Sequence, residues 1–243
     1  MQFDLVFSIA FVALSAVITA TLTSVLAHTA RARAMTAVAM GLWFAAVLIM
    51  GATGALGGNG AGAPGLGLAV AGPALLLSWM ALRAGRTAGN SGPPTAVLIA
   101  THAIRIIPGV AMVLLYGAHR LSAPFAPAAG WGDIAIGFSA GPVAWLVGRP
   151  GGRPLALIWN GLGCLDLISA VSLGAMSAQG PAHLFLEPPG SGAMTTLPWI
   201  FIPAFLVPGL FALHVAIFGR LLRGRSSDLQ AEEAHIGGMA YFR

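Results

Sequence analysis

The sequence contains no lysine, and all 12 of its basic residues are arginine. A retinal chromophore is carried as a Schiff base on a lysine amine, so this absence excludes a light-driven rhodopsin. There is one cysteine, Cys164. A single cysteine excludes an intramolecular disulfide and gives no information about the redox compartment.

Charge of either sign is also scarce. Only 8% of the 243 residues are charged, whereas about a quarter are charged in an ordinary soluble domain. The apolar fraction is 57% and the mean hydropathy is +0.86, which fits a chain whose surface faces lipid. The net charge is +5, but the arginines are scattered singly without a basic run, so we expect the lipid bilayer and no nucleic acid as a partner.

Long apolar runs dominate what is present. Crossing the hydrocarbon core takes about 20 mainly apolar residues. The first such run has no basic residue before Arg31 and is too long for a signal peptide, so we interpret it as a retained helix. The sequence predicts an all-α integral membrane bundle of seven transmembrane helices within 1–225, followed by a short polar cytoplasmic tail, 226–243. The seven segments are 4–27, 35–57, 65–83, 95–117, 130–148, 154–176 and 198–222.

The arginines alternate between the predicted loops. The loops 58–65 and 177–197 have none, and 118–129 has only Arg120. By the positive-inside rule this pattern predicts an N-terminus outside and a cytoplasmic C-terminus. The remaining loops and the C-terminal segment carry Arg31, Arg33, Arg83, Arg86, Arg149, Arg153, Arg220, Arg223, Arg225 and Arg243.

A few strongly polar side chains lie inside the predicted segments, where each is costly unless it has a partner. With a rise of ~1.5 Å per residue, Arg105 and Asp166 both lie near the bilayer midplane, which predicts an ion pair if their helices are neighbours. Asp133 is expected near the outer surface, close to Arg120, as an interfacial clamp. The candidate ligand- or proton-binding residues are Arg105, Asp166, His214, Asn160, His102 and Asp133.

His102 and His214 are predicted at similar heights on different helices, as a bis-histidine haem requires. The sequence has no CxxCH or HxxxH motif and no second histidine on either helix. We therefore predict no metal site. Ser139 and Ser169 lie among small residues without a nucleophile motif, so catalytic residues and cofactors stay unassigned.

Three stretches resemble a family of bacterial polytopic membrane proteins without an assigned function: PFAPAAGWGDIAIG (124–137), WNGLGCLDLISAV (159–171) and LPWIFIPAFLVPGLFALH (197–214). The likeness covers about 95–220 and includes the signatures GWGD and WNxLGxxDL. It implies a multi-pass protein of the bacterial inner membrane. It also supports all the candidate residues as a set except His102, which stands where the family is expected to have glutamine.

Three classes of function remain open. The first is transport or permeation of a proton or small solute, with Arg105 and Asp166 as the central pair and His214 toward the cytoplasm. The second is a membrane-embedded enzyme or redox subunit acting on a lipid, quinone or haem. The third is an accessory or receptor-like subunit whose charges only hold the helices together. The sequence specifies no oligomeric state.

Overall fold

The computed structural model describes residues 2–57, 60–88, 92–180 and 183–240, and every regular element in them is helical. The elements are α1 (Gln2–Leu26), α2 (Ala30–Thr53), α3 (Gly62–Ala88), α4 (Thr95–Thr101), the 3₁₀ turn η1 (His102–Arg105), α5 (Ile106–Gly117), α6 (Phe125–Leu146), α7 (Gly152–Ser177), the 3₁₀ turn η2 (Gly192–Thr195), the π-helical turn η3 (Ile202–Leu206) and α8 (Val207–Ala240).

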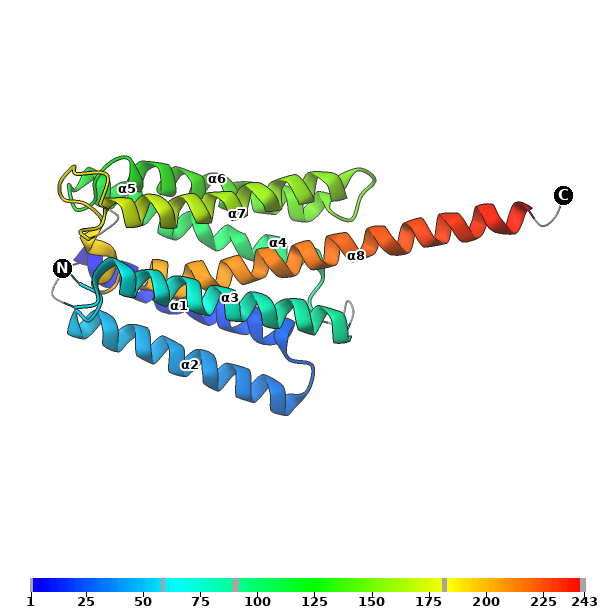
Figure 1. Cartoon of the computed structure of the whole chain (residues 1–243), viewed down its shortest axis with the longest axis horizontal. Helices are drawn as coiled ribbons and strands as arrows, with labels where there is room; N and C mark the ends of the chain where they lie inside the picture. Colours follow the sequence, from blue (N-terminus) through cyan, green and yellow to red (C-terminus); the bar gives the residue numbers. More distant parts are fainter. Residues whose placement is uncertain (1, 58–59, 89–91, 181–182, 241–243) are drawn as a thin grey trace.

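Helix α8 lies at the centre of the bundle. It runs between a group formed by α1, α2 and α3 and a second group formed by α4 to α7 (Figure 1). It packs on α3, α7, α1 and α4. The apolar segment Ile202–Arg223, formed by η3 and the first part of α8, is 67% buried, against 11% for α2, which lies at the edge of the bundle. Side chains of α8 therefore reach both groups.

Within the described residues, six helical segments are long and apolar enough to cross a membrane. They coincide with six of the seven predicted segments. The seventh, α6, has 22 residues, includes Asp133 and Pro142, and is not among these six. The six segments are Phe3–Leu26, Ala30–Thr53, Gly62–Thr87, Thr95–Gly117, Gly152–Ser177 and Ile202–Arg223.

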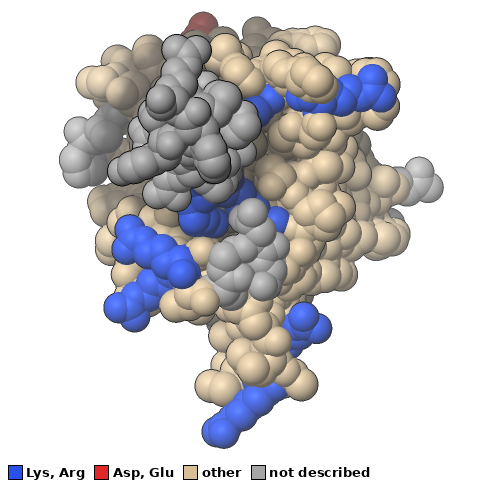
Figure 2. All heavy atoms as spheres, turned by 90° about the vertical axis from the view of Figure 1, so that its right-hand side faces the viewer, with Lys and Arg blue, Asp and Glu red and all other residues tan. Residues whose placement is uncertain are grey.

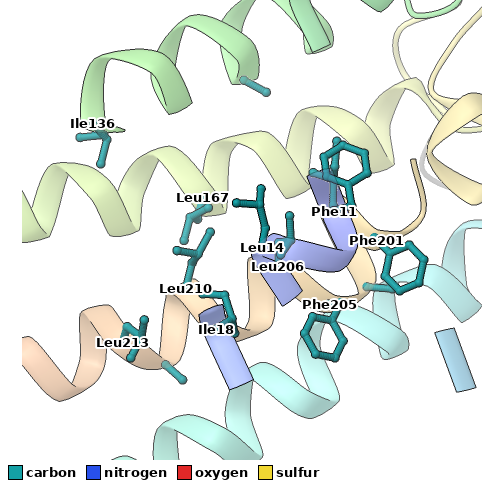
Figure 3. Close-up of a cluster of buried hydrophobic side chains, with 14 of the residues drawn as sticks. Phe11, Leu14, Ile18, Ile136, Leu167, Phe201, Phe205, Leu206, Leu210 and Leu213 are labelled. Atoms are coloured by element: carbon teal, nitrogen blue, oxygen red, sulfur yellow. The ribbon is translucent and has the colours of Figure 1, made fainter. Parts of the chain in front are cut away.

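The apolar core lies where α1 and α7 meet η3 and α8. Figure 3 shows Leu14 of α1 beside Leu206 and Ile18 of α1 beside Leu210, with Leu167 of α7 close to them. Many large apolar side chains instead point outward, as a lipid-facing surface requires. Those exposed by more than 60% include Leu42, Leu68, Phe138 and Trp145.

Pro108 accounts for the interruption of the fourth predicted span. Proline has no N–H, so Pro108 leaves the Ile104 carbonyl without its helical hydrogen bond, and its ring crowds that carbonyl. The backbone just before it tightens into the 3₁₀ turn His102–Arg105. A 3₁₀ turn inside a helix often marks a functional hinge, and this one contains two of the candidate residues.

A second proline acts on the π-helical turn of the last span. Pro208 provides no N–H for the carbonyl of Ala204, four residues earlier. The indole Nε1–H of Trp43, from α2, donates to this carbonyl at 3.1 Å. The hydrogen bond satisfies the freed group and ties the peripheral α2 to the central helix.

Candidate functional site

Arg105 is the centre of a buried polar cluster. Its side chain is fully buried, and its guanidinium donates toward three other helices. Nε donates to Asp133 Oδ1 of α6 at 2.6 Å, and Nη2 donates to Asp166 Oδ2 of α7. Nη1 lies 3.3 Å from the Gly163 carbonyl and 3.3 Å from Nε2 of His214. The predicted Arg105–Asp166 pair is therefore present.

The prediction that Asp133 pairs with Arg120 near the outer surface was wrong. Asp133 is buried and bonds Arg105, whereas Arg120 donates to Asp4 at 2.9 Å on an exposed surface. The error lies in the start of α6, predicted at 130 but found at Phe125. Asp133 therefore lies roughly 12 Å along the helix, level with Arg105.

His214 and Asn160 form the second layer of the cluster. Arginine only donates hydrogen bonds, so His214 Nε2 accepts from Arg105 and the imidazole proton lies on Nδ1. Nδ1 is 2.7 Å from Asn160 Oδ1, to which it donates. The Asn160 amide then donates to the His214 carbonyl at 2.9 Å. These hydrogen bonds hold His214 as the tautomer with its proton on Nδ1, so that its Nε2 faces the Arg105 guanidinium. We call Arg105, Asp133, Asp166, His214 and Asn160 the arginine cluster.

His102 joins the cluster through its ring. Its centroid lies 3.9 Å from that of His214, and Trp159 meets it edge-on at 5.6 Å. Trp159 is anchored by a 2.8 Å hydrogen bond from its Nε1 to Ser139 Oγ. Both ring nitrogens of His102 are buried without a hydrogen-bond partner among the described residues. The structure thus brings all six candidate residues together.

This geometry does not fit a bis-histidine haem. The two imidazoles contact each other, which leaves no space for a porphyrin between them. Both ring nitrogens of His214 are also engaged by Arg105 and Asn160. Within the described part of the chain, no three His, Cys, Asp or Glu side chains are grouped to hold a metal ion.

Glycines of the two signatures make room for the cluster. In GWGD, a Cβ at Gly130 would press on the α5 backbone, and one at Gly132 would overlap the Asp166 carboxylate. In WNGLGCLDL, a Cβ at Gly163 would overlap the His214 ring. Gly132 was not singled out from the sequence as the residue that makes room for Asp166. The alternation of glycine and aspartate in GWGD was the available signal.

Asp166 is the most accessible member of the cluster. Its side chain is 17% exposed, compared with 9% for Asp133 and 0% for Arg105. Gly132, which is itself partly exposed, lies directly against the Asp166 carboxylate and has no side chain to cover it. The carboxylate therefore reaches the surface at the seam between α6 and α7.

A cavity of about 70 Å³ reaches the cluster at Asp133. Ala63, Ala178 and Met194 line its other part and lie toward the arginine-poor end. Asp133 and Ser191 are the only polar residues among its lining residues within the described part of the chain. Its volume is enough for several water molecules. Asp133 and Asp166 are thus approached from different sides.

Replacing Gly163 with alanine is expected to destabilise the protein by about 1–3 kcal/mol, because the new methyl group overpacks against the His214 ring. Gly161 is the matched control on the same helix, since a Cβ there would meet only Phe218 at an ordinary 3.9 Å. Thermal unfolding in detergent measures both variants. Equal midpoints for Gly163→Ala and Gly161→Ala would contradict the packing described here.

Comparison with known families gives a match over the greater part of the chain. The model of a family described as a domain of unknown function, DUF8737, matches residues 63–222, about two thirds of the sequence. The match begins in α3 and includes every residue of the arginine cluster. Searches of the curated proteins and of the solved structures gave no match.

Proposed function

The chain belongs to the DUF8737 family of domains of unknown function, and from the arginine cluster we propose that it transports or conducts a proton or a small cationic solute across the membrane. The observation that carries this proposal is the composition of the site. Two carboxyl groups contact one guanidinium, so the cluster is neutral only when it holds one additional proton or other cation.

The accessibility of the two carboxyl groups supports movement of that charge. Asp166 is partly exposed at the seam between α6 and α7, and Asp133 borders the cavity that extends toward the arginine-poor end. Arg105 bonds both groups and separates them. In the proposed cycle the proton or cation associates with one carboxyl group and leaves from the other, while Arg105 shifts its hydrogen bonds between them.

The proposal includes a topology. We propose that α6 is a seventh span and that the membrane is the inner membrane of a bacterium. The N-terminus would then lie outside and the C-terminus in the cytoplasm. Support comes from the arginines, which gather at the end of the bundle from which α8 emerges (Figure 2). In this orientation the Asp133 cavity is on the outer side.

The variant Asp166→Asn tests the transport proposal. An asparagine side chain still accepts a hydrogen bond from Arg105 but does not titrate, so we expect a folded protein whose proton flux falls to that of protein-free liposomes. The flux is measured in proteoliposomes with a pH-sensitive dye inside and an imposed membrane potential.

The control is Asp4→Asn, which removes a carboxylate from an exposed ion pair with Arg120 and should leave the flux unchanged. Wild-type protein that adds no flux over empty liposomes for a proton or for small cations would refute the proposal. An Asp166→Asn variant as active as the wild type would refute the role given to Asp166.

The apolar lining of the Asp133 cavity favours a second candidate, an enzyme or redox subunit that binds a lipid or quinone. In that case the ligand's polar group contacts Asp133 and its apolar part occupies the space between α3 and α7. Extraction of the purified protein with organic solvent distinguishes the two candidates. A stoichiometric quinone would favour the second, and an extract free of quinone and of any single enriched lipid would favour transport.

A further inference from the structure

A second basic site lies at the arginine-rich end of the bundle, outside the arginine cluster (Figure 2). Arg220 and Arg223 stand three residues apart on α8, so they share one face of the helix. Both line a small cavity of about 10 Å³, together with His28 and with Gly85 of α3. The site is therefore shared by α3, α8 and the segment that joins α1 to α2.

The fold makes room for the Arg223 side chain. A Cβ at Gly85 would lie 2.7 Å from Arg223 Nη2, and one at Gly219 would lie 3.2 Å from Nη1. The guanidinium thus fills space that any other residue at Gly85 would occupy. The Nε atom of Arg223 is buried and has no hydrogen-bond partner among the described residues. A buried donor without an acceptor is costly, which indicates that a ligand oxygen completes this site.

Arg220 orders the other side of the cavity. It is 8% exposed, and its Nη1 donates to the carbonyl of Pro93 in the segment before α4. Two guanidinium groups therefore border the same small space. Guanidinium groups match the geometry of phosphate and carboxylate oxygens, and helix-bounded basic pockets at the cytoplasmic side of a membrane suit lipid head groups.

The surroundings of the cavity favour a lipid over a soluble anion. Arg223 directly follows the apolar segment 198–222 of the sequence, at the level where head groups begin. Val25, Leu82 and Ala216 line the cavity beside the arginines. Leu82 is 38% exposed and Leu222 is 53% exposed, so an apolar surface for an acyl chain continues next to the site. The cavity admits about one oxygen atom, and the rest of the head group remains outside.

We propose that Arg223, with Arg220 and His28, binds the phosphate group of an anionic membrane lipid in the pocket between α3 and α8. One phosphate oxygen accepts from Arg223 Nε, and the acyl chains lie along Leu82 and Leu222. This site goes beyond the proposed transport function and does not depend on it. Its ligand anchors the cytoplasmic end of α8.

Native mass spectrometry of the full-length protein in detergent tests the proposal, with phosphatidylglycerol titrated against phosphatidylcholine. We expect the wild type to prefer phosphatidylglycerol, and Arg223→Gln to weaken its binding by about tenfold or more through loss of a charged hydrogen bond. Gly85→Ala should weaken it too without any change of charge, because the added methyl group displaces the guanidinium. Thermal unfolding checks that both variants are folded.

The matched control is Arg149→Gln, which removes a positive charge at the same end from an exposed side chain stacked on Trp145 at 3.2 Å. It should retain wild-type affinity. An equal loss of phosphatidylglycerol affinity in Arg223→Gln and Arg149→Gln would show that the lipid is held by general electrostatic attraction to the surface and not by the pocket. That result would overturn the proposal. Displacement of the lipid by low concentrations of inorganic phosphate would assign the site to a soluble anion, and equal binding of the two lipids by the wild type would also overturn it.

Discussion

Replacing Arg105 with glutamine is expected to lower the free energy of unfolding by about 3–5 kcal/mol, the cost of leaving buried charges without their partner. The variant removes the only cation that contacts both Asp133 and Asp166 in the described structure. It also removes the donor to the Gly163 carbonyl and to His214. Most of the variant is expected to aggregate during purification, and fluorescence-detected size-exclusion chromatography measures the monodisperse fraction.

Arg105→Lys is the matched control, because it keeps the charge. One ammonium group has three donors and no planar fork, so it cannot reproduce the four contacts of the guanidinium. We expect partial recovery of the monodisperse fraction relative to Arg105→Gln. A Gln variant as stable as the wild type would contradict the view that Arg105 holds the cluster together.

Variants that include Arg105→Gln also distinguish a structural role of the arginine cluster from a functional one. If the charges only join helices, removing all three together with Arg105→Gln, Asp133→Asn and Asp166→Asn should restore most of the stability lost in the single variant. Removing Arg105 and Asp166 alone would not be enough, because Asp133 would remain unpaired. A triple variant that folds and still conducts like the wild type would show that these charges only join the helices, and it would refute their proposed role in transport.

Much of the helical framework is predictable from hydropathy alone. Six apolar segments coincide with helices long enough to cross a membrane, because the bilayer constrains both their length and their composition. The start of α6 was not predictable by the same signal. Pro124 and Pro127 made the preceding stretch resemble a loop, although proline is tolerated in the first helical turn, where N–H groups have no partner. That five-residue shift moved Asp133 away from Arg105.

The site was predictable as far as depth along each helix determines it. Arg105 and Asp166 were matched because both lie near the middle of their segments. The depth of a residue along its helix does not say which way the helix is rotated or which helices are its neighbours. Rotation and neighbours bring Asp133 and His214 to the guanidinium of Arg105. The tautomer of His214 needed the positions of Arg105 and Asn160 together, which only the folded chain provides.

Substitution of Gly132 with alanine is expected to have the second large effect. A Cβ at this position would overlap Oδ1 of Asp166, and that carboxylate is already bonded to Arg105 through Oδ2. The side chain of Asp166 has to leave the guanidinium to admit the methyl group. The expected cost is therefore that of a broken buried pair, about 3–5 kcal/mol, rather than the about 1–3 kcal/mol of simple overpacking.

Gly141 is the matched control for Gly132, since it lies on the same helix and a Cβ there meets nothing within 4 Å. Gly141→Ala should be neutral or stabilising by up to about 1 kcal/mol, because alanine is the better helix former. Combining Gly132→Ala with Asp166→Ala removes the atoms that collide, so the double variant should lose less stability than the two single variants added together. Thermal unfolding of the four proteins in detergent measures this coupling. Strict additivity would show that Gly132 and Asp166 do not touch, and the explanation of the GWGD signature as space for the Asp166 carboxylate would then be wrong.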